Sequence, residues 1–242
     1  MRRTTARTTA RSVLVTGGNR GIGLAIARRF AAAGDLVAVT YRGDEPPGEE
    51  GLLAVQCDVT DSHQVERAFK EAESVHGPVT VLVANAGVTQ DRLLVRMSEA
   101  DFTSVIDTNL TGAFRVAQRA IRGMLREGHG RIVLISSTAA LHGAPGQTNY
   151  AAAKAGLVGF ARSLTHELGP RDITCNVVAP GLTETDMSRA LTAEQRRELL
   201  RRTPAGRPAQ PEEVADAVAF LAGAGSVRGA VIPVDGGAGL GH

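Results

Sequence analysis

The amino-acid sequence predicts an α/β domain in which a seven-stranded parallel sheet carries helices on both faces. Two observations predict this fold class. Short runs of apolar and β-branched residues alternate along the chain with longer segments of helical periodicity. The short runs are continuously apolar, as in strands that are buried on both faces of a parallel sheet. A chain of 242 residues without repeats or a linker fits a single domain.

The order of these segments follows directly along the chain. Strands are predicted at residues 13–16, 36–40, 53–57, 79–84, 131–136, 174–178 and 230–233. Helices are predicted at residues 21–33, 62–75, 101–126, 149–168 and 211–222. The connection at residues 41–51 is too short for an ordinary crossover helix. Residues 182–205 form a long insertion with a capping box at Thr192-Ala-Glu-Gln195. Such insertions are often lids, so we expect a substrate lid here, with a plain surface helix as the alternative.

Charge and composition argue against several classes of protein. Residues 1–11 carry four Arg and no acid, and without these four the net charge of +2 becomes −2, which disfavours nucleic-acid binding by the body. Because this tail has no apolar stretch, we expect a disordered cytoplasmic extension, with a transit peptide as the alternative. No segment is long and apolar enough to span a membrane. Cys57 and Cys175 lie in apolar runs, which predicts reduced buried thiols, and no His or Cys cluster has metal-ligand spacing.

A glycine-rich turn follows the first predicted strand and leads into a helix. Glycines allow a tight turn and a close approach of a ligand to the backbone. The helix N-terminus offers free N–H groups and a positive dipole end to a phosphate. The turn therefore predicts a dinucleotide diphosphate site, with an empty strand–helix turn as the alternative. Its expected binding residues are Gly17, Asn19, Arg20, Gly21, Ile22 and Gly23.

The end of the second predicted strand indicates which dinucleotide binds. An acidic residue at this place binds the ribose 2′-hydroxyl of NAD. This chain has Arg42 there, and Arg20 in the glycine turn. Two guanidinium groups suit a 2′-phosphate, so NADPH is favoured. Asp44 and Glu45 follow closely and keep NAD as the alternative.

Polar residues and glycines also follow the next four predicted strands. The Asp58 carboxylate, beside Val59, can accept a hydrogen bond from an adenine amino group. The other strand ends are Asn85-Ala86-Gly87, Ser136-Ser137 and Pro180-Gly181. Because ligands of open α/β sheets bind outside the carboxyl ends of the strands, we expect these segments to line one site.

Tyr150 and Lys154 form the most informative pair in the chain. Residues four apart on a helix share a face. An ammonium group beside a phenol favours the phenolate and lowers the phenol pKa from its usual value of about 10. The pair therefore suits proton donation near neutral pH, with an ordinary exposed Tyr/Lys pair as the alternative.

Taken together, these motifs make the chain resemble the short-chain dehydrogenase/reductase family over residues 12–237. The resemblance is carried by Thr16-Gly17-x-x-x-Gly21-x-Gly23, Asn85-Ala86-Gly87, Asn109, Ser137, Tyr150-x-x-x-Lys154 and Pro180-Gly181. It implies a single-domain Rossmann fold and an NADP-linked oxidoreductase with a catalytic tetrad of Asn109, Ser137, Tyr150 and Lys154. It also implies cofactor contacts from Tyr150, Lys154, Pro180, Gly181, Thr183 and Thr185.

Each member of the implied tetrad has a role. Tyr150 protonates the alkoxide that forms from a ketone, and the Ser137 hydroxyl donates to the substrate oxygen. Lys154 lowers the pKa of Tyr150 and bonds to the nicotinamide ribose. Asn109 interrupts a helical pattern and is implied to hold a water that links Lys154 to solvent, although a helix-surface amide is the plain alternative.

Within the family, the chain is similar to the β-ketoacyl-acyl carrier protein reductases of type II fatty acid synthesis, of the actinobacterial and mycobacterial type. The supporting stretches are residues 109–114, 149–156, 176–181, 184–187 and 234–237. The similarity implies NADPH-dependent formation of (3R)-hydroxyacyl thioesters on acyl carrier protein by a homotetramer. Two alternatives stay open: a ketoreductase of polyketides or other small carbonyl compounds, and a nucleotide-sensing protein without catalysis.

The similarity carries one expectation about docking and two departures. Arg171, joined by Arg122, Arg126 and Arg131, is implied to add positive charge near the cleft for an acidic carrier protein, with a solvated surface as the alternative. Ala84 stands where many relatives have Asn. Thr183 stands where related reductases often have Ile.

Overall fold

A parallel sheet of seven strands forms the centre of the protein in the computed structural model, which describes residues 10–43, 46, 48–189 and 191–239. The strand order is β3-β2-β1-β4-β5-β6-β7, and every pairing is parallel. The strands are β1 Ser12–Val15, β2 Leu36–Tyr41, β3 Leu52–Gln56, β4 Val81–Ala84, β5 His129–Ile135, β6 Asp172–Pro180 and β7 Val231–Val234. The predicted α/β fold is therefore confirmed.

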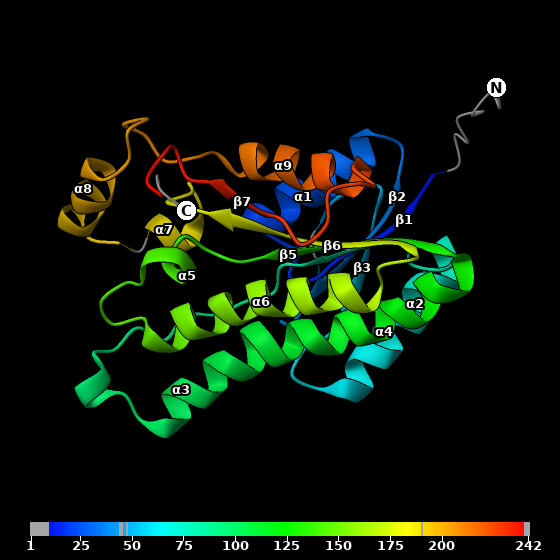
Figure 1. Ribbon diagram of the computed structural model, residues 1–242, viewed down its shortest axis with the longest axis horizontal. Helices are drawn as coiled ribbons and strands as arrows, with labels where there is room; N and C mark the ends of the chain where they lie inside the picture. The colour runs from blue at the N-terminus through cyan, green and yellow to red at the C-terminus, as the bar shows by residue number, and fades with distance from the viewer. Residues whose placement is uncertain (1–9, 44–45, 47, 190, 240–242) are drawn as a thin grey trace.

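Helices cover the sheet on both faces, as Figure 1 shows. The helices α1 Gly21–Ala32 and α9 Pro211–Gly223 pack side by side on one face. The other face carries α2 Ser62–His76, α4 Gly112–Glu127 and α6 Thr148–Glu167. Strand β1 shows why the two layers form. Val13 and Val15 point to the core under α1 and α9, and Leu14 points to the opposite core.

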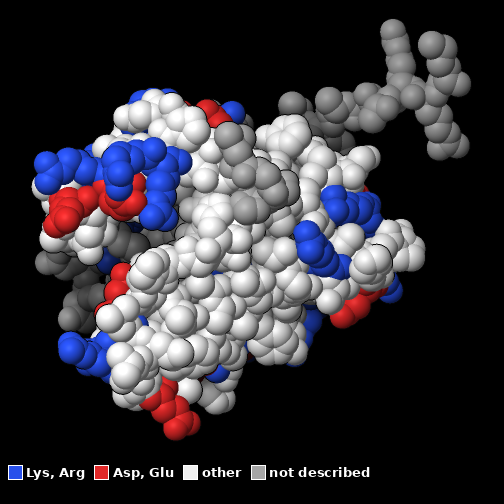
Figure 2. Space-filling view, turned by 60° about the vertical axis from the view of Figure 1, so that its left-hand side comes forward, with Lys and Arg blue, Asp and Glu red and all other residues white. Residues whose placement is uncertain are grey.

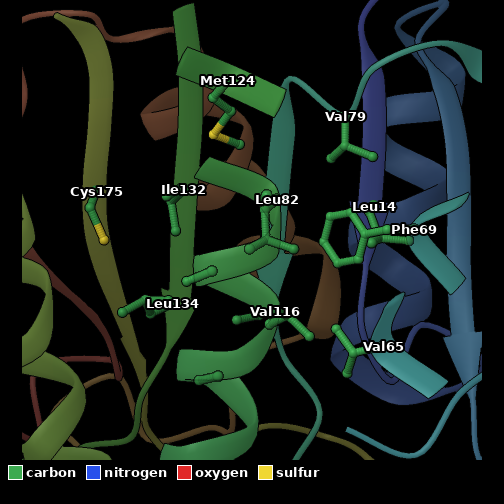
Figure 3. Close-up of a cluster of buried hydrophobic side chains, with 14 of the residues drawn as sticks. Leu14, Val65, Phe69, Val79, Leu82, Val116, Met124, Ile132, Leu134 and Cys175 are labelled. Atoms are coloured by element: carbon green, nitrogen blue, oxygen red, sulfur yellow. The ribbon is translucent and has the colours of Figure 1, made fainter. Parts of the chain in front are cut away.

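The core under α2, α4 and α6 is drawn in Figure 3. Phe69 of α2 and Met124 of α4 are fully buried there against Leu82 of β4 and Ile132 of β5. Cys175 lies in the same core and Cys57 is also buried. Burial raises the pKa of Cys175 to about 12 and that of Cys57 to about 11, so both stay thiols at neutral pH.

The predicted helix over residues 101–126 is wrong in one respect, because the structure divides it into three parts. Helix α3 Glu99–Ile106 is followed by a π-helical turn, η2 Asp107–Thr111, and then by α4. Three short elements were also not predicted: η1 Leu94–Arg96, α5 Ala139–His142 and α7 Asp186–Arg189. The capping box at Thr192 is confirmed and begins α8 Ala193–Arg201.

The last residue of the predicted tail over residues 1–11 contacts the body of the domain. Arg11 forms an ion pair with Asp35 at 2.6 Å and stacks over the Phe30 ring, so the body of the domain includes it. Residues 1–9 lie outside the described residues, as do Asp44 and Glu45, the acidic pair that kept NAD as an alternative.

The strand order reverses at β1, because β1 lies between β2 and β4. Connections therefore leave the carboxyl ends of β1 and β4 toward opposite sides of the sheet. In open α/β sheets, ligands bind in the crevice that this reversal creates. The glycine-rich turn and Asn85 follow these two strands directly, which places them at the crevice.

Candidate active site

The glycine-rich turn has the backbone geometry that a phosphate cradle needs. Gly17 and Gly21 adopt φ values of +62° and +53°, which favour glycine. A Cβ atom on Gly23 would lie 2.3 Å from the Gly17 carbonyl oxygen, so no larger residue fits there. Helix α1 begins without a side-chain cap at Arg20, which leaves its N-terminal amides for a ligand. The turn therefore fits the diphosphate of a dinucleotide.

Three side chains hold this turn in place. The Asn85 amide donates to the carbonyl oxygens of Thr16 and Gly17, at 3.0 Å each. The Thr16 hydroxyl accepts hydrogen bonds from the backbone N–H groups of Asn85 and Ala86. The Thr40 hydroxyl accepts from the Gly17 amide at 3.2 Å. Thr40 was not predicted as a site residue, and Thr16 was named only as part of the family motif, although a polar residue at the end of an apolar strand is a signal for such a role.

The remaining cofactor candidates lie around the same edge. Arg20 and Arg42 are exposed, at the start of α1 and just after β2. The Asp58 carboxylate accepts from both the amide and the hydroxyl of Thr60, which fixes its orientation, and Val59 is buried. On the far side of the turn, the Thr185 methyl carbon lies 3.5 Å from the Cβ position of Gly21. Thr185 therefore faces the glycine turn across the crevice.

Strand β6 ends at this edge and brings the next candidates with it. The Pro180 carbonyl oxygen accepts from the Thr138 amide at 2.9 Å, and the Gly181 amide donates to Val234. Thr183 is buried and donates from its hydroxyl to the Gly181 carbonyl oxygen at 3.1 Å. Related reductases often have Ile at this position. The hydrogen bond satisfies the buried Thr183 hydroxyl and so explains how Thr is accommodated here.

Tyr150, Ser137 and Lys154 converge beside the carboxyl end of β5. The Tyr150 hydroxyl is hydrogen-bonded with Ser137, the second residue after β5. The Lys154 ammonium group lies 5.6 Å from the centre of the Tyr150 ring and donates to the Ile135 carbonyl oxygen at 2.8 Å. The Ser136 hydroxyl donates to the Lys154 carbonyl oxygen, also at 2.8 Å. Two buried hydrogen bonds therefore fasten the Lys154 end of α6 to β5.

Burial, rather than the Tyr150–Lys154 contact, dominates the protonation of this site. Desolvation raises the pKa of Tyr150, and the bond with Ser137 opposes it. We expected Lys154 to lower the pKa of Tyr150, but in this structure desolvation raises it and Lys154 is not among the causes of the shift. Burial lowers the pKa of Lys154 to about 8, so its charge is itself unfavourable. The phenol consequently keeps its proton at neutral pH.

Asn109 lies in the π-helical turn, and its side chain faces Lys154. Its amide group donates to the carbonyl oxygens of Val88 and Val105, at 2.9 Å each. The Oδ1 atom is buried and has no hydrogen-bond partner within the described part of the chain. Measured from the Cβ position of Gly87, this Oδ1 lies at 2.5 Å and the Lys154 Nζ at 3.4 Å. A π-helical turn inside a helix is frequently found at functional sites. Asn109 is therefore buried beside Lys154 and is not a helix-surface amide.

The predicted docking arginines do not lie at the carboxyl ends of the strands, where Tyr150 and Ser137 lie. Arg122 and Arg126 are near the end of α4, Arg131 is in the first half of β5, and Arg171 immediately precedes β6. All four therefore lie toward the amino ends of the strands, roughly 20 Å from Ser137 along a strand such as β5. Arg131 also forms an ion pair with Asp172 at 2.9 Å. The four arginines therefore lie away from the cleft of their own chain, and their predicted role in carrier docking stays a prediction.

Basic residues of another segment do lie at the site edge. Helix α8 follows β6 and α7 at the left of Figure 1, and its charged side chains gather at the upper left of Figure 2. Residues 182–207 contain six Arg and four acidic residues. No residue of α8 is buried. Among the described residues, no cluster of His, Cys, Asp or Glu could hold a metal ion, and no helix is long and apolar enough to cross a membrane.

Comparison with known proteins places this geometry in context. Residues 17–239 match the family model described as Enoyl-(Acyl carrier protein) reductase. The chain is 56% identical over 235 residues to the 3-oxoacyl-[acyl-carrier-protein] reductase MabA of Mycobacterium tuberculosis, covering 96% of this chain and 94% of that protein. It is 44% identical over 233 residues to the 3-oxoacyl-[acyl-carrier-protein] reductase FabG of Escherichia coli, covering 93% and 95%.

Proposed function

The chain belongs to the short-chain dehydrogenase/reductase family, and on that premise we propose that it is a 3-oxoacyl-[acyl-carrier-protein] reductase of fatty acid biosynthesis. It reduces a β-ketoacyl thioester on acyl carrier protein to the (3R)-hydroxyacyl thioester, with NADPH as reductant. The convergence of Tyr150, Ser137 and Lys154 beside the glycine turn carries this proposal. The names of the relatives supply the substrate.

The residues at the crevice fit a nicotinamide dinucleotide. The glycine turn and the amides of α1 bind the diphosphate, and Asp58 and Val59 border the adenine. Arg20 and Arg42 bind the ribose 2′-phosphate, because two guanidinium groups match its charge and shape. Bound NADPH supplies the hydride. The nicotinamide half of NADPH would be bordered by Asn85-Ala86-Gly87, Thr183 and Thr185.

Tyr150 and Ser137 handle the substrate oxygen. The hydrogen bond between their hydroxyl groups supports an arrangement in which one carbonyl oxygen reaches both. Ser137 donates to this oxygen and orients the ketone. Tyr150 is protonated at neutral pH because burial raises its pKa, so it can give its proton as the oxygen acquires negative charge.

Lys154 and Asn109 support the phenolate that this transfer leaves. The Lys154 ammonium group, 5.6 Å from the ring centre, stabilises the negative charge electrostatically. A water between Lys154 Nζ and the unpartnered Asn109 Oδ1 satisfies both groups and leads a proton back toward Tyr150. The buried position of Asn109 is therefore part of the proton supply.

Two features of the wider enzyme belong to this proposal. A homotetramer accounts for the exposed Phe114 and Leu125 on α4, which apolar partners of a second copy can cover. Size-exclusion chromatography with light scattering measures this state. A cytoplasmic location, expected from the two thiols, stays a prediction.

One assay tests the activity itself. The enzyme is expected to oxidise NADPH with short and long β-ketoacyl carrier proteins, and to act far more weakly on free ketones. A preference for polyketide-like or free ketone substrates over acyl carrier thioesters contradicts the proposed substrate.

The cofactor choice is tested at Arg42. Replacing Arg42 by Ala removes one of the two cations at the proposed 2′-phosphate site. We expect the NADPH/NADH ratio of kcat/KM to fall by about tenfold or more, since a charge-assisted hydrogen bond contributes roughly 1.5–3 kcal/mol. The Arg122→Ala variant, on the opposite edge, is the control. An unchanged cofactor ratio in Arg42→Ala shows that the 2′-phosphate is bound elsewhere.

A further inference from the structure

Asn149 stands immediately before Tyr150 and is fully buried. Its Oδ1 atom accepts from the Tyr150 backbone N–H at 2.8 Å. Its Nδ2 atom donates to the carbonyl oxygens of Gln90 and Asp101, at 3.0 and 3.1 Å. The side chain therefore uses one acceptor and both donor hydrogens in three hydrogen bonds. A buried amide satisfied in this way has a strongly defined position.

The first of these bonds replaces a helix cap. Backbone N–H groups in the first turn of a helix have no partner within the helix, and a side chain at the N-cap usually accepts one of them. In α6 the N-cap residue Gln147 makes no such bond. Asn149, inside the helix, accepts from the Tyr150 amide instead. The amide of the proposed proton donor is thus held by its own neighbour.

The other two bonds join this end of α6 to the segment after β4. Gln90 lies between Gly87 and η1, and Asp101 lies in the first turn of α3. Two further contacts join the same segments at the surface. The Arg92 backbone N–H donates to the Gly146 carbonyl oxygen at 2.7 Å, and the Gln147 side-chain Nε2 donates to the Asp91 carboxylate at 2.8 Å. Water can replace exposed side-chain contacts such as Gln147–Asp91, whereas it does not reach Asn149.

The two ends of the turn from Tyr150 to Lys154 are therefore fastened independently. Strand β5 holds the Lys154 end through Ser136 and the Ile135 carbonyl oxygen. Asn149 holds the Tyr150 end. We propose that Asn149 is a positioning residue, which sets the Tyr150 hydroxyl relative to Ser137 by tying the start of α6 to the segment at Gln90 and Asp101. This inference rests on the proposed function for the role of Tyr150.

The chain offers a matched control for a mutational test. Asn176 in β6 is equally buried, donates to the Val227 carbonyl oxygen at 2.8 Å and accepts from the Ala230 amide at 3.0 Å. These bonds join β6 to the segment before β7. Cys175 and Val177 point to the core under α6, so Asn176 between them points to the opposite face of the sheet. Replacing either Asn by Ala or Asp removes a buried amide of the same kind, but only Asn149 contacts Tyr150.

The kinetic test compares Asn149→Ala and Asn149→Asp with the same changes at Asn176, using a β-ketoacyl carrier protein and NADPH. We expect kcat to fall by about tenfold to a hundredfold in both Asn149 variants, because a small misplacement of a reacting group has an effect of this size. The Kd for NADPH is expected to stay within about twofold. Asn176 variants that remain folded are expected to keep the kcat of the parent.

The Asp variant adds a pH readout. Its carboxylate faces the Gln90 and Asp101 carbonyl oxygens, which accept and cannot donate. Protonation restores one donor, so the kcat of Asn149→Asp relative to the parent is expected to recover as the pH falls. The corresponding ratio for Asn176→Asp is expected to be independent of pH while the protein is folded.

A spectroscopic measurement keeps this inference separate from the proposed activity. The protein contains two Tyr and no Trp, so in a Tyr41→Phe background ultraviolet absorbance follows the Tyr150 phenol alone. In Asn149→Ala, solvent reaches the displaced Tyr150 ring, so the pKa of Tyr150 is expected to fall toward its ordinary value. In Asn176→Ala, the pKa of Tyr150 is expected to stay as in the parent. An unshifted titration, or equal loss of kcat in the Asn149 and Asn176 variants, overturns the inference. An inactive parent enzyme overturns the proposed function alone.

Discussion

Tyr150 and Lys154 meet in a part of the protein where desolvation outweighs the attraction of charges. Lys154 is 3% exposed, and burial lowers its pKa to about 8. Desolvation also raises the pKa of Tyr150, whose side chain is half-buried. Tyr150 is therefore a neutral phenol that can donate a proton. The neighbouring Lys154 is only partly charged at mildly basic pH. The phenolate that results is the better partner for the ammonium group.

The first prediction at the residue scale concerns proton donation. Replacing Tyr150 by Phe removes the hydroxyl and retains the ring. We expect kcat for the β-ketoacyl thioester to fall by about 10²-fold or more, the usual contribution of a positioned acid. NADPH binding, measured by fluorescence titration, is expected to persist. The Tyr41→Phe variant is the control, and a fully active Tyr150→Phe enzyme refutes the assigned role.

The second prediction concerns the charge of Lys154. The folded pKa of about 8 is lower than the ordinary 10.5, so between these two values the unfolded chain binds the proton and the folded chain does not. In this window the free energy of unfolding rises with pH, and below it the buried charge destabilises the fold by on the order of 3 kcal/mol. Replacing Lys154 by Met removes this dependence.

The comparison is made on the protein without cofactor, by urea unfolding between pH 7 and pH 10. The stability of Lys154→Met relative to the parent is expected to be most favourable near pH 7 and to decline as the pH rises above about 8. Lys70→Met, at an exposed lysine of α2, is the control. A difference independent of pH in Lys154→Met contradicts the lowered pKa.

The sequence predicted the identity of these residues but not the direction of the Tyr150 shift. Spacing of four residues reports that two side chains share a helix face, and it contains no information on how deeply that face is buried. Asn149 illustrates the same limit. Its partners Gln90 and Asp101 lie 59 and 48 residues away, so no local pattern shows that it contacts them.

At the scale of elements, glycine-rich backbone and irregular helix place the functional groups. The turn after β1 brings Gly23 against the Gly17 carbonyl oxygen, and the π-helical turn carries Asn109. The glycine pattern was visible in the sequence because each residue there is constrained by sterics. The π-helical turn was not, since its widened hydrogen bonding within a long helical pattern leaves the spacing of apolar residues almost unchanged.

The element-scale prediction tests the glycine turn. Replacing Gly23 by Ala puts a Cβ atom 2.3 Å from the Gly17 carbonyl oxygen and 2.5 Å from Asn85 Nδ2. The turn must then open, so we expect NADPH affinity to fall by more than tenfold, together with a lower Tm. Gly223→Ala, at the end of α9, meets nothing within 4 Å and is the control, with both quantities unchanged. Normal NADPH affinity in Gly23→Ala excludes this turn as the diphosphate site.

At the scale of the whole molecule, the direction of the strands decides what lies together. The fold class and all seven strands were predicted, because parallel buried strands leave a strong pattern. The location of Arg122, Arg126 and Arg131 was not. They are near Ser137 in sequence, but β5 carries the chain from one edge of the sheet to the other between Arg131 and Ser137. Sequence proximity across a strand therefore means separation in space.

The last prediction applies this geometry to the carrier protein. An acidic carrier that delivers a thioester to Tyr150 has to approach the carboxyl edge of the sheet, where α8 presents Arg197 and Arg201 to solvent. We expect Arg197→Glu/Arg201→Glu to lower kcat/KM for a carrier-bound substrate several-fold and to weaken its salt dependence, because electrostatic steering acts on association. Activity on a small thioester without carrier is expected to be unchanged.

The matched double change is Arg122→Glu/Arg126→Glu, which reverses the same charge on the opposite edge of the same chain. If the carrier protein docks at the edge where the site opens, only the α8 variant loses more kcat/KM on carrier-bound substrates than on small ones. If the α4 variant discriminates instead, a carrier bound at that edge has to reach the site of another copy in the oligomer, because its own Ser137 lies roughly 20 Å away along the sheet. Equal effects on both substrates in both variants exclude charge-guided docking at either edge.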